Sequence, residues 1–348
     1  MPRPVDNSEA EHSLIERLLE DLRASPGPLS GAIEARRLGG SRAALWKHIR
    51  ALRRMGYVID AAPRAGYRLV SAPDRPYPWE VRPGLRTRRF GQYVIYREVT
   101  GSTQDECREL AERGAPEGTL VVAERQESAR GRLGRAYFTP PGGLWFSLLL
   151  RPERAPEEVI LLSLVAAIAV HGAVEEVTGL RPTIRWPNDL LLNGRKIAGI
   201  LVELASEQDV LRYVILGVGL NVNLRQEDFP EDLRPIATSI REALGREAPR
   251  VALLQRFLER LEALYDRYLA EGPKPVLDAW LALPNILGQR VTVYAPRETW
   301  SGIATGLDEE GALLVRTDDG GVRRVVAGDV RLTTEPPPPP PGRPEERT

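Results

Sequence analysis

The chain has 348 residues and a formal net charge of zero, with 42% hydrophobic and 28% charged residues. This composition is typical of a globular protein with two or three domains, and it excludes a disordered chain or one embedded in a membrane. One cysteine and three scattered histidines exclude an internal disulfide, a multi-cysteine metal site, a zinc hydrolase and a Ser-His-Asp triad.

Residues 1–70 are expected to form a winged helix-turn-helix domain. Apolar residues recur at helical spacing near the start, and Ser30 and Ser41 can each cap a further helix. A Gly39-Gly40 turn separates those two helices, and two strand-like runs flank a Pro-Arg-Ala-Gly turn. The expected elements are helices over residues 14–24, 30–38 and 41–55, and a two-stranded wing over residues 56–70.

The third of these helices carries a basic face. Leu45, Ile49 and Leu52 fall on one stripe, whereas lysine and arginine fall on the other side. A charge run alone more often marks a solvated helix face, but here the turn, the cap, the basic face and the wing occur together, which favours DNA binding. The residues expected to contact DNA are Ser41, Arg42, Lys47, His48, Arg50, Arg54 and, at the tip of the wing, Arg64.

Residues 71–87 are expected to be a semi-rigid linker, since four prolines fall within 14 residues there. From 88 to 283, strand-like and helical runs alternate, which predicts a mixed α/β domain. The longest apolar run, residues 159–174, is shorter than the roughly 20 residues of a membrane span. We expect it to be a buried helix.

Short β-rich runs over residues 284–334 predict an SH3-like barrel. Residues 335–348 are expected to form a disordered proline-rich tail, to which no function is assigned. The N-terminus has no apolar core followed by a small-residue cleavage site, so a cytoplasmic protein is expected.

Three arginines alternate with two glycines in Gln126-Glu-Ser-Ala-Arg-Gly-Arg-Leu-Gly-Arg135, directly after a predicted strand. Glycines let backbone N–H groups approach an anion closely, and guanidinium forks match phosphate or carboxylate oxygens in pairs. The segment, which we term the arginine-glycine loop, therefore predicts an anion site. It is not a P-loop, because Gly-x-x-x-x-Gly-Lys-Ser/Thr is absent.

A second motif, Arg185-Trp-Pro-Asn-Asp-Leu190, is followed closely by Asn193-Gly-Arg-Lys-Ile-Ala-Gly-Ile-Leu201. Lys196 within it is one of 3 lysines beside 45 arginines, which suggests a need for a compact charge, although a surface lysine remains an alternative on this count alone. Two shorter motifs, Gly217-Val-Gly-Leu-Asn221 and Thr100-Gly-Ser-Thr-Gln-Asp105, are weak alone, since a turn and a helix cap would also produce them.

In this order the four motifs resemble those of the biotin protein ligases, and the preceding winged helix resembles the subgroup that also represses biotin-synthesis genes. The resemblance spans residues 12–332 and implies a ligase domain of the class II synthetase-like α/β type. Three positions depart from the usual pattern: Ala129 replaces a glycine, Arg185 a lysine and Gln104 an asparagine.

The resemblance implies a role for each matched residue. The expected biotin-binding residues are Ser102, Thr103, Gln104, Gln126, Arg130, Gly131, Arg132, Lys196, Gly199, Gly217 and Gly219. Those expected to bind ATP and Mg²⁺ are Arg132, Arg135, Asn188, Asp189, Lys196 and Asn221, with Asp189 as the metal ligand. The expected catalytic residues are Lys196, Arg130, Arg132 and Arg135.

The implied reaction forms biotinyl-5'-AMP from biotin and ATP and transfers the biotin to a lysine of the biotin carboxyl carrier protein of acetyl-CoA carboxylase. Positioning and charge can perform both steps without a protein nucleophile. Operator DNA is the second expected partner, bound by a homodimer that forms when biotinyl-adenylate orders the arginine-glycine loop.

Two alternatives remain at this point. One is a lipoate ligase, whose Arg-Arg-x-Ser-Gly-Gly-Gly and His-Asp motifs are missing. The other is a ligand-sensing DNA-binding regulator without ligase activity, against which the intact Lys196 and the three loop arginines count.

Overall fold

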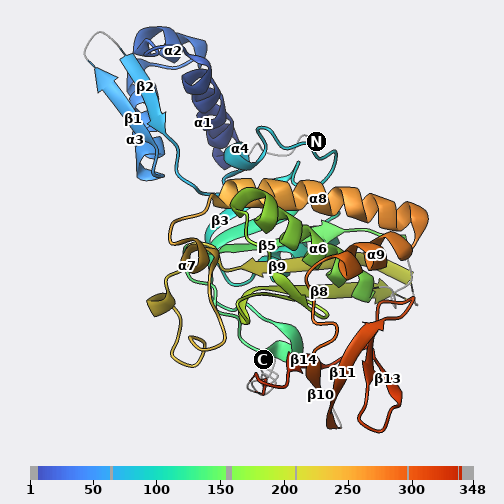
Figure 1. Cartoon of the computed structure of the whole chain (residues 1–348). Helices are drawn as coiled ribbons and strands as arrows, with labels where there is room; N and C mark the ends of the chain where they lie inside the picture. The colour runs from blue at the N-terminus through green and yellow to red at the C-terminus, as the bar shows by residue number, and fades with distance from the viewer. Residues whose placement is uncertain are drawn as a thin grey trace, which may run out of the picture. The chain divides into compact units, whose positions relative to one another are not determined.

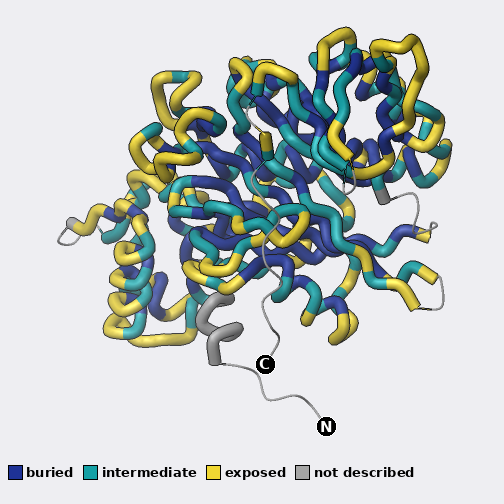
Figure 2. Tube along the Cα trace, turned by 90° about the horizontal axis from the view of Figure 1, so that it is seen from below, coloured by how far each residue is buried: buried dark blue, intermediate teal, exposed yellow. Residues whose placement is uncertain are grey.

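The computed structural model describes residues 7–62, 66–153, 159–207, 210–295, 298–335 and 337–338. They divide between two compact units, Met1–Asp74 (the N-terminal unit) and Arg75–Thr348 (the C-terminal unit). Figure 1 shows the elements of each unit, and Figure 2 shows that buried residues concentrate in the interior and exposed ones in the outer loops.

The N-terminal unit confirms the expected winged helix-turn-helix. Ser41 caps the third helix, because its hydroxyl accepts a hydrogen bond from Ala44 N at 3.2 Å, whereas Ser30 makes no such side-chain bond. Arg53 ties that helix to the wing by donating to the carbonyl oxygen of Ile59 at 2.5 Å. Arg64 lies outside the described residues. The elements are α1 (Asn7–Ala24), α2 (Gly31–Arg37), α3 (Arg42–Arg54) and the antiparallel strands β1 (Val58–Ala62) and β2 (Gly66–Ser71).

The C-terminal unit is built on a seven-stranded mixed sheet of order β3-β4-β5-β9-β8-β7-β6, in which only β3 and β4 are parallel. The strands are β3 (Val94–Thr100), β4 (Leu120–Gln126), β5 (Leu144–Leu150), β6 (Thr183–Arg185), β7 (Asp189–Leu192), β8 (Arg195–Glu207) and β9 (Val210–Leu220). Their alternating side chains fill two cores, one on each face of the sheet.

Helices cover both faces, which confirms the α/β class. Helix α5 (Thr103–Glu112) packs Cys107 and Ala111 against one face. Helices α6 (Val159–Thr178), α8 (Arg250–Glu271) and α9 (Lys274–Ala282) belong to the core on the other face, and α7 (Ile240–Leu244) is a short helix between β9 and α8. Helix α6 is long and apolar enough to cross a membrane, but 72% of its apolar window is buried inside the protein, so it is a core helix.

The last part of the chain forms a five-stranded antiparallel sheet of order β13-β12-β11-β10-β14. Its strands are β10 (Arg290–Tyr294), β11 (Thr299–Leu307), β12 (Leu313–Arg316), β13 (Val322–Val325) and β14 (Asp329–Leu332). The sequence analysis did not anticipate β14, because a run of only four residues, in which charged and apolar residues alternate, carries little pattern. The buried Trp186 connects this sheet to the core of the seven-stranded sheet by donating from Nε1 to the carbonyl oxygen of Gly311 at 2.9 Å.

Parts of the expected linker (residues 71–87) and of the expected tail (residues 335–348) pack against the C-terminal unit. Helix α4 (Pro78–Val81) lies within the expected linker, and its Trp79 and Val81 are buried in the C-terminal unit. Its end is held by Gln255, which donates to the carbonyl oxygen of Val81 at 2.9 Å. Glu335, the expected first residue of the tail, accepts from the buried Arg185 at 2.5 Å, because that guanidinium needs a carboxylate partner.

The N-terminal unit contains a buried acid. Glu34 of α2 is only 1% exposed. Burial first, and then a hydrogen bond and charge repulsion from Asp21, raise the pKa of Glu34 from 4.5 to about 7. The Glu34 carboxyl therefore ionises less readily in the folded unit than in the unfolded chain. Its contribution to the stability of the folded unit is complete below pH 4.5, where the carboxyl is protonated in both states, and is lost as the pH rises to about 7.

We predict that Glu34→Gln, which keeps the shape and removes the charge, abolishes this pH dependence. The measurement is hydrogen exchange of peptides from α1 and α2 in the intact chain at about pH 5 and about pH 8, corrected for intrinsic rates. Protection should fall at the higher pH in the unsubstituted protein and in the control Glu20→Gln, which changes an exposed residue of α1, but not in Glu34→Gln. Equal protection at both pH values in the unsubstituted protein would contradict the assignment.

Candidate functional site

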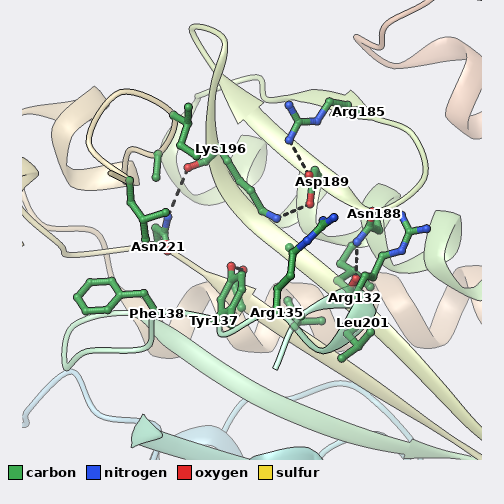
Figure 3. A pocket seen from close by; sticks show the side chains of 18 of the residues that line it. Arg132, Arg135, Tyr137, Phe138, Arg185, Asn188, Asp189, Lys196, Leu201 and Asn221 are labelled. Atoms are coloured by element: carbon green, nitrogen blue, oxygen red, sulfur yellow. Dashed lines mark hydrogen bonds and ion pairs between the residues drawn. The ribbon is translucent and has the colours of Figure 1, made fainter. Parts of the chain in front are cut away.

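A pocket of about 500 Å³ lies among β8, β9, the arginine-glycine loop and the segment around β14. Figure 3 shows its charged end. Every residue expected to bind biotin or ATP lines this pocket. The structure therefore brings together four motifs that are spread over more than 100 residues of sequence.

At one end of the pocket, Asp189 lies between two cations. Lys196 Nζ is 2.6 Å from Asp189 Oδ1, and Arg185 Nη2 is 2.6 Å from Asp189 Oδ2 (Figure 3). Burial alone would raise the pKa of Asp189, but the charges of Lys196 and Arg185 outweigh it and hold that pKa well below its usual value. The carboxylate is therefore ionised at neutral pH and is a weak base.

The pairing of strands β7 and β8 creates this arrangement. In their antiparallel register Asp189 lies opposite Gly199, and Lys196 opposite Leu191. Lys196 is further fixed by its backbone, since its N–H donates to the carbonyl oxygen of Ile236 at 2.8 Å. The side-chain amide of Asn221, expected to bind ATP, donates to the carbonyl oxygens of Thr238 at 2.9 Å and Lys196 at 3.4 Å. In this structure Asn221 supports the backbone at the pocket floor.

The arginine-glycine loop closes on itself through its backbone. Gly131 N donates to the carbonyl oxygen of Arg135 at 2.7 Å, and Tyr137 N donates to that of Ala129 at 2.9 Å. Leu133 at its tip has φ 57°, a left-handed conformation that a β-branched residue would resist.

Each loop arginine binds a different part of the C-terminal unit. Arg130 Nη2 is 2.5 Å from Asp105 Oδ1 of α5. Arg132 donates to Asn188 Oδ1 at 3.2 Å and to the carbonyl oxygen of Gly328 at 3.0 Å. Arg135 pairs with Asp329 of β14 at 2.7 Å. The loop is therefore held over the pocket by side chains from three places in the fold.

At the other end of the pocket, the side chains of Ser102, Thr103, Gln104 and Gln126 are polar and uncharged. Thr103 donates to Gln126 Oε1 from its backbone N at 2.7 Å and from its hydroxyl at 3.1 Å. Ser102 caps α5, accepting from Asp105 N at 3.4 Å, and Gln104 Nε2 donates to Glu203 at 3.1 Å. Fixed hydroxyl and amide groups of this kind suit a neutral ligand that both donates and accepts hydrogen bonds.

Glycines make room between the two ends. Gly199 lies opposite Gly219 in the β8–β9 pair. A Cβ on Gly219 would lie 2.4 Å from the ring of Tyr137, and one on Gly217 would lie 2.8 Å from the side chain of Gln104. A side chain at either position would displace the pocket wall.

Tyr137 is a pocket residue that the sequence analysis missed. Its hydroxyl donates to the carbonyl oxygen of Gly219 at 3.1 Å, and Lys196 Nζ lies 5.6 Å from the ring centre. Burial, and then the charge of Asp189, raise the pKa of Tyr137, so the phenol stays protonated. The available signal was the aromatic pair Tyr137-Phe138, two residues after the last loop arginine.

No three His, Cys, Asp or Glu side chains group to hold a metal ion in the described part of the chain. A single carboxylate such as Asp189 fits a magnesium ion that arrives with a nucleotide, because Mg²⁺ is commonly held by one or two carboxylates together with substrate phosphates.

The N-terminal unit presents a separate basic face on α3. Arg42, Lys47, Arg50 and Arg54 are exposed there, as is the capping Ser41, whereas His48 is half-buried. Trp46, which the sequence analysis missed, is 48% exposed on the same face, with the Arg50 guanidinium 4.7 Å from its ring centre. An exposed aromatic residue among cations suits contact with nucleic acid.

Comparison with known proteins gives matches to all three parts of the chain. Residues 96–221 match the biotin/lipoate A/B protein ligase family, residues 286–332 the biotin protein ligase C-terminal domain, and residues 15–68 an HTH domain. The bifunctional ligase/repressor BirA of Bacillus subtilis (strain 168) is 41% identical over 305 residues, which cover 87% of this chain and 94% of that protein. The bifunctional ligase/repressor BirA of Escherichia coli (strain K12) is 30% identical over 296 residues, which cover 85% of this chain and 90% of that protein.

Solved structures agree with these matches. The biotin protein ligase from Aquifex aeolicus in complex with biotin and ATP superposes with a TM-score of 0.61 at 30% identity, covering 70% of this chain and 100% of that one.

Proposed function

This chain belongs to the biotin protein ligase family, and from that premise we propose that its pocket forms biotinyl-5'-AMP from biotin and ATP and passes the biotin to a lysine of a biotin carboxyl carrier protein. The observation that carries the proposal is the division of the pocket into a neutral polar end and a cationic end. Biotin has a neutral ureido ring at one end and a carboxylate at the other. The Ser102, Thr103, Gln104 and Gln126 cluster suits the ring, and Lys196 suits the carboxylate.

In the first step an oxygen of the biotin carboxylate attacks the α-phosphorus of ATP, and the bond from that phosphorus to pyrophosphate breaks. Two anions must approach each other, so cations are needed around the reacting atoms. Lys196, Arg132 and Arg135 supply them, each exchanging its resting partner for a substrate oxygen. Mg²⁺, held by the triphosphate and Asp189, would neutralise further charge when bound.

In the second step the acceptor amine attacks the acyl carbon of biotinyl-5'-AMP, an amide forms and AMP leaves. The mixed anhydride is prone to hydrolysis, so the arginine-glycine loop has to keep water away from it until the acceptor arrives. The low pKa of Asp189 argues against that carboxylate as the base that takes the proton of the amine.

The same proposal includes a regulatory role in the cytoplasm. The basic face of α3 supports binding to operator DNA. Biotinyl-5'-AMP, by ordering the arginine-glycine loop, would favour a homodimer that places two such helices on a two-fold operator.

We predict that the purified chain, given biotin and ATP, adds one biotin to a biotin carboxyl carrier domain, as a mass increase on its acceptor lysine. A carrier with that lysine replaced by arginine should gain nothing, and lipoate should neither substitute for biotin nor compete with it. Transfer of lipoate would support the lipoate-ligase alternative. Biotin binding without any transfer would support the other alternative, a ligand-sensing DNA-binding regulator without ligase activity.

We also predict that Arg42→Ala, Trp46→Ala and Arg50→Ala each weaken binding to DNA from biotin-synthesis promoters by roughly tenfold. Fluorescence anisotropy with biotin and ATP present provides the measurement. Arg36→Ala is the matched control, because Arg36 is exposed on α2 and its side chain donates to Ala32 O of the same helix. A loss in Arg36→Ala equal to those in Arg42→Ala and Arg50→Ala would show a non-specific charge effect and contradict recognition by α3.

A further inference from the structure

Asp105 lies at the start of α5, directly after three residues that line the pocket. It follows Gln104 in the first turn of α5, and it receives two guanidinium groups on one oxygen. Arg130 Nη2 of the arginine-glycine loop lies 2.5 Å from Asp105 Oδ1, and Arg108 Nη1 lies 2.7 Å from the same oxygen. Burial alone would raise the pKa of Asp105, but hydrogen bonds and charge from Arg130 and Arg108 hold it below its usual value.

This pair belongs to a longer polar chain. Arg108 Nη2 is 2.7 Å from Glu203 Oε2, and the same oxygen accepts from Gln104 Nε2 at 3.1 Å. A continuous chain of contacts thus joins Gln104, which is expected to meet the ureido ring, to Arg130 of the arginine-glycine loop. The side chains between them are Glu203, Arg108 and Asp105. An isolated surface ion pair contributes little, but a connected set with two guanidinium groups on one carboxylate fixes geometry more firmly.

The other two loop arginines differ from Arg130 in what they bind. Arg132 rests on an amide and a carbonyl oxygen, and Arg135 on Asp329, next to the cationic end of the pocket. A phosphate can replace those partners. Arg130 instead pairs with Asp105 on α5, the helix whose first residues form the neutral end of the pocket.

We propose, on the basis of the proposed function, that Asp105 is a positioning residue, an ionic latch that holds Arg130 and thereby keeps the arginine-glycine loop closed over the adenylate. Asp105 touches neither reacting atom. Its effect is on how long the loop stays closed and how long biotinyl-5'-AMP stays bound, rather than on the rate of its formation. Because the latch connects to Gln104 through Arg108 and Glu203, occupation of the ring site also stiffens it.

The experiment compares the unsubstituted protein, Asp105→Asn, Asp105→Glu and the control Glu106→Gln. Glu106 is the neighbouring acid on α5, but it pairs with Arg97 and Thr100 outside the loop. Two rates are measured: dissociation of biotinyl-5'-AMP, and tryptic cleavage after Arg130, Arg132 and Arg135, followed by mass spectrometry with and without ligand. Both are repeated from about 0.05 M to about 0.5 M salt, since screening weakens an exposed ion pair.

We expect both rates to be about fivefold higher in Asp105→Asn, which is the upper range for loss of an exposed ion pair. In this variant both rates should also depend much less on the salt concentration. The maximal rate of adenylate formation should change by less than twofold. Asp105→Glu should restore the salt dependence, and Glu106→Gln should match the unsubstituted protein. Unchanged dissociation and cleavage in Asp105→Asn would overturn the latch.

Two further outcomes are also decisive. If the substituted proteins do not fold, cleavage of the unsubstituted loop still tests the latch, because a rate that does not respond to salt would overturn it. If the unsubstituted protein forms no biotinyl-5'-AMP, the proposed function fails, yet cleavage of the ligand-free loop still responds to Asp105→Asn if the latch exists. The two failures are therefore distinguishable.

Discussion

The pocket depends on a carboxylate shared by two cations. Asp189 is half-buried, and it is ionised because Lys196 and Arg185 lie on its two oxygens; those cations are tolerated there because Asp189 lies between them. Farther along the same wall, Arg185 also binds Glu335 and Arg135 binds Asp329. At rest, each of these cations has an anionic partner within the protein.

This resting balance explains how a cationic site can fold before its substrates arrive. Unpaired charges of one sign would repel one another and destabilise the pocket. A polyanionic substrate offers new oxygens to the same side chains, so binding becomes an exchange of partners rather than the burial of bare charges. Glu335 takes part although it lies beyond the matched C-terminal domain, which ends at residue 332.

Much of this fold could be predicted from sequence, and the failures have physical causes. The capped helix that follows Ser41 and the apolar core helix α6 were predictable because their signals are local. Tyr137 was not, because only the register of β8 and β9 brings Gly219 under its ring. The role of Glu335 was hidden in a proline-rich run, and the burial of Trp79 was hidden in a stretch that reads as a linker. The partners of the loop arginines lie 25 to almost 200 positions away, which no spacing rule reveals.

The central claim is that Lys196, released from Asp189, activates the carboxylate of biotin. Biotin-dependent exchange of labelled pyrophosphate into ATP tests it most directly, in the unsubstituted protein, in Lys196→Ala and in Lys274→Ala, whose exposed lysine pairs with Asp278 of the same helix. The account predicts exchange that Lys196→Ala lowers by about a hundredfold or more and Lys274→Ala leaves intact. Full exchange in Lys196→Ala, or none in the unsubstituted protein, would contradict it.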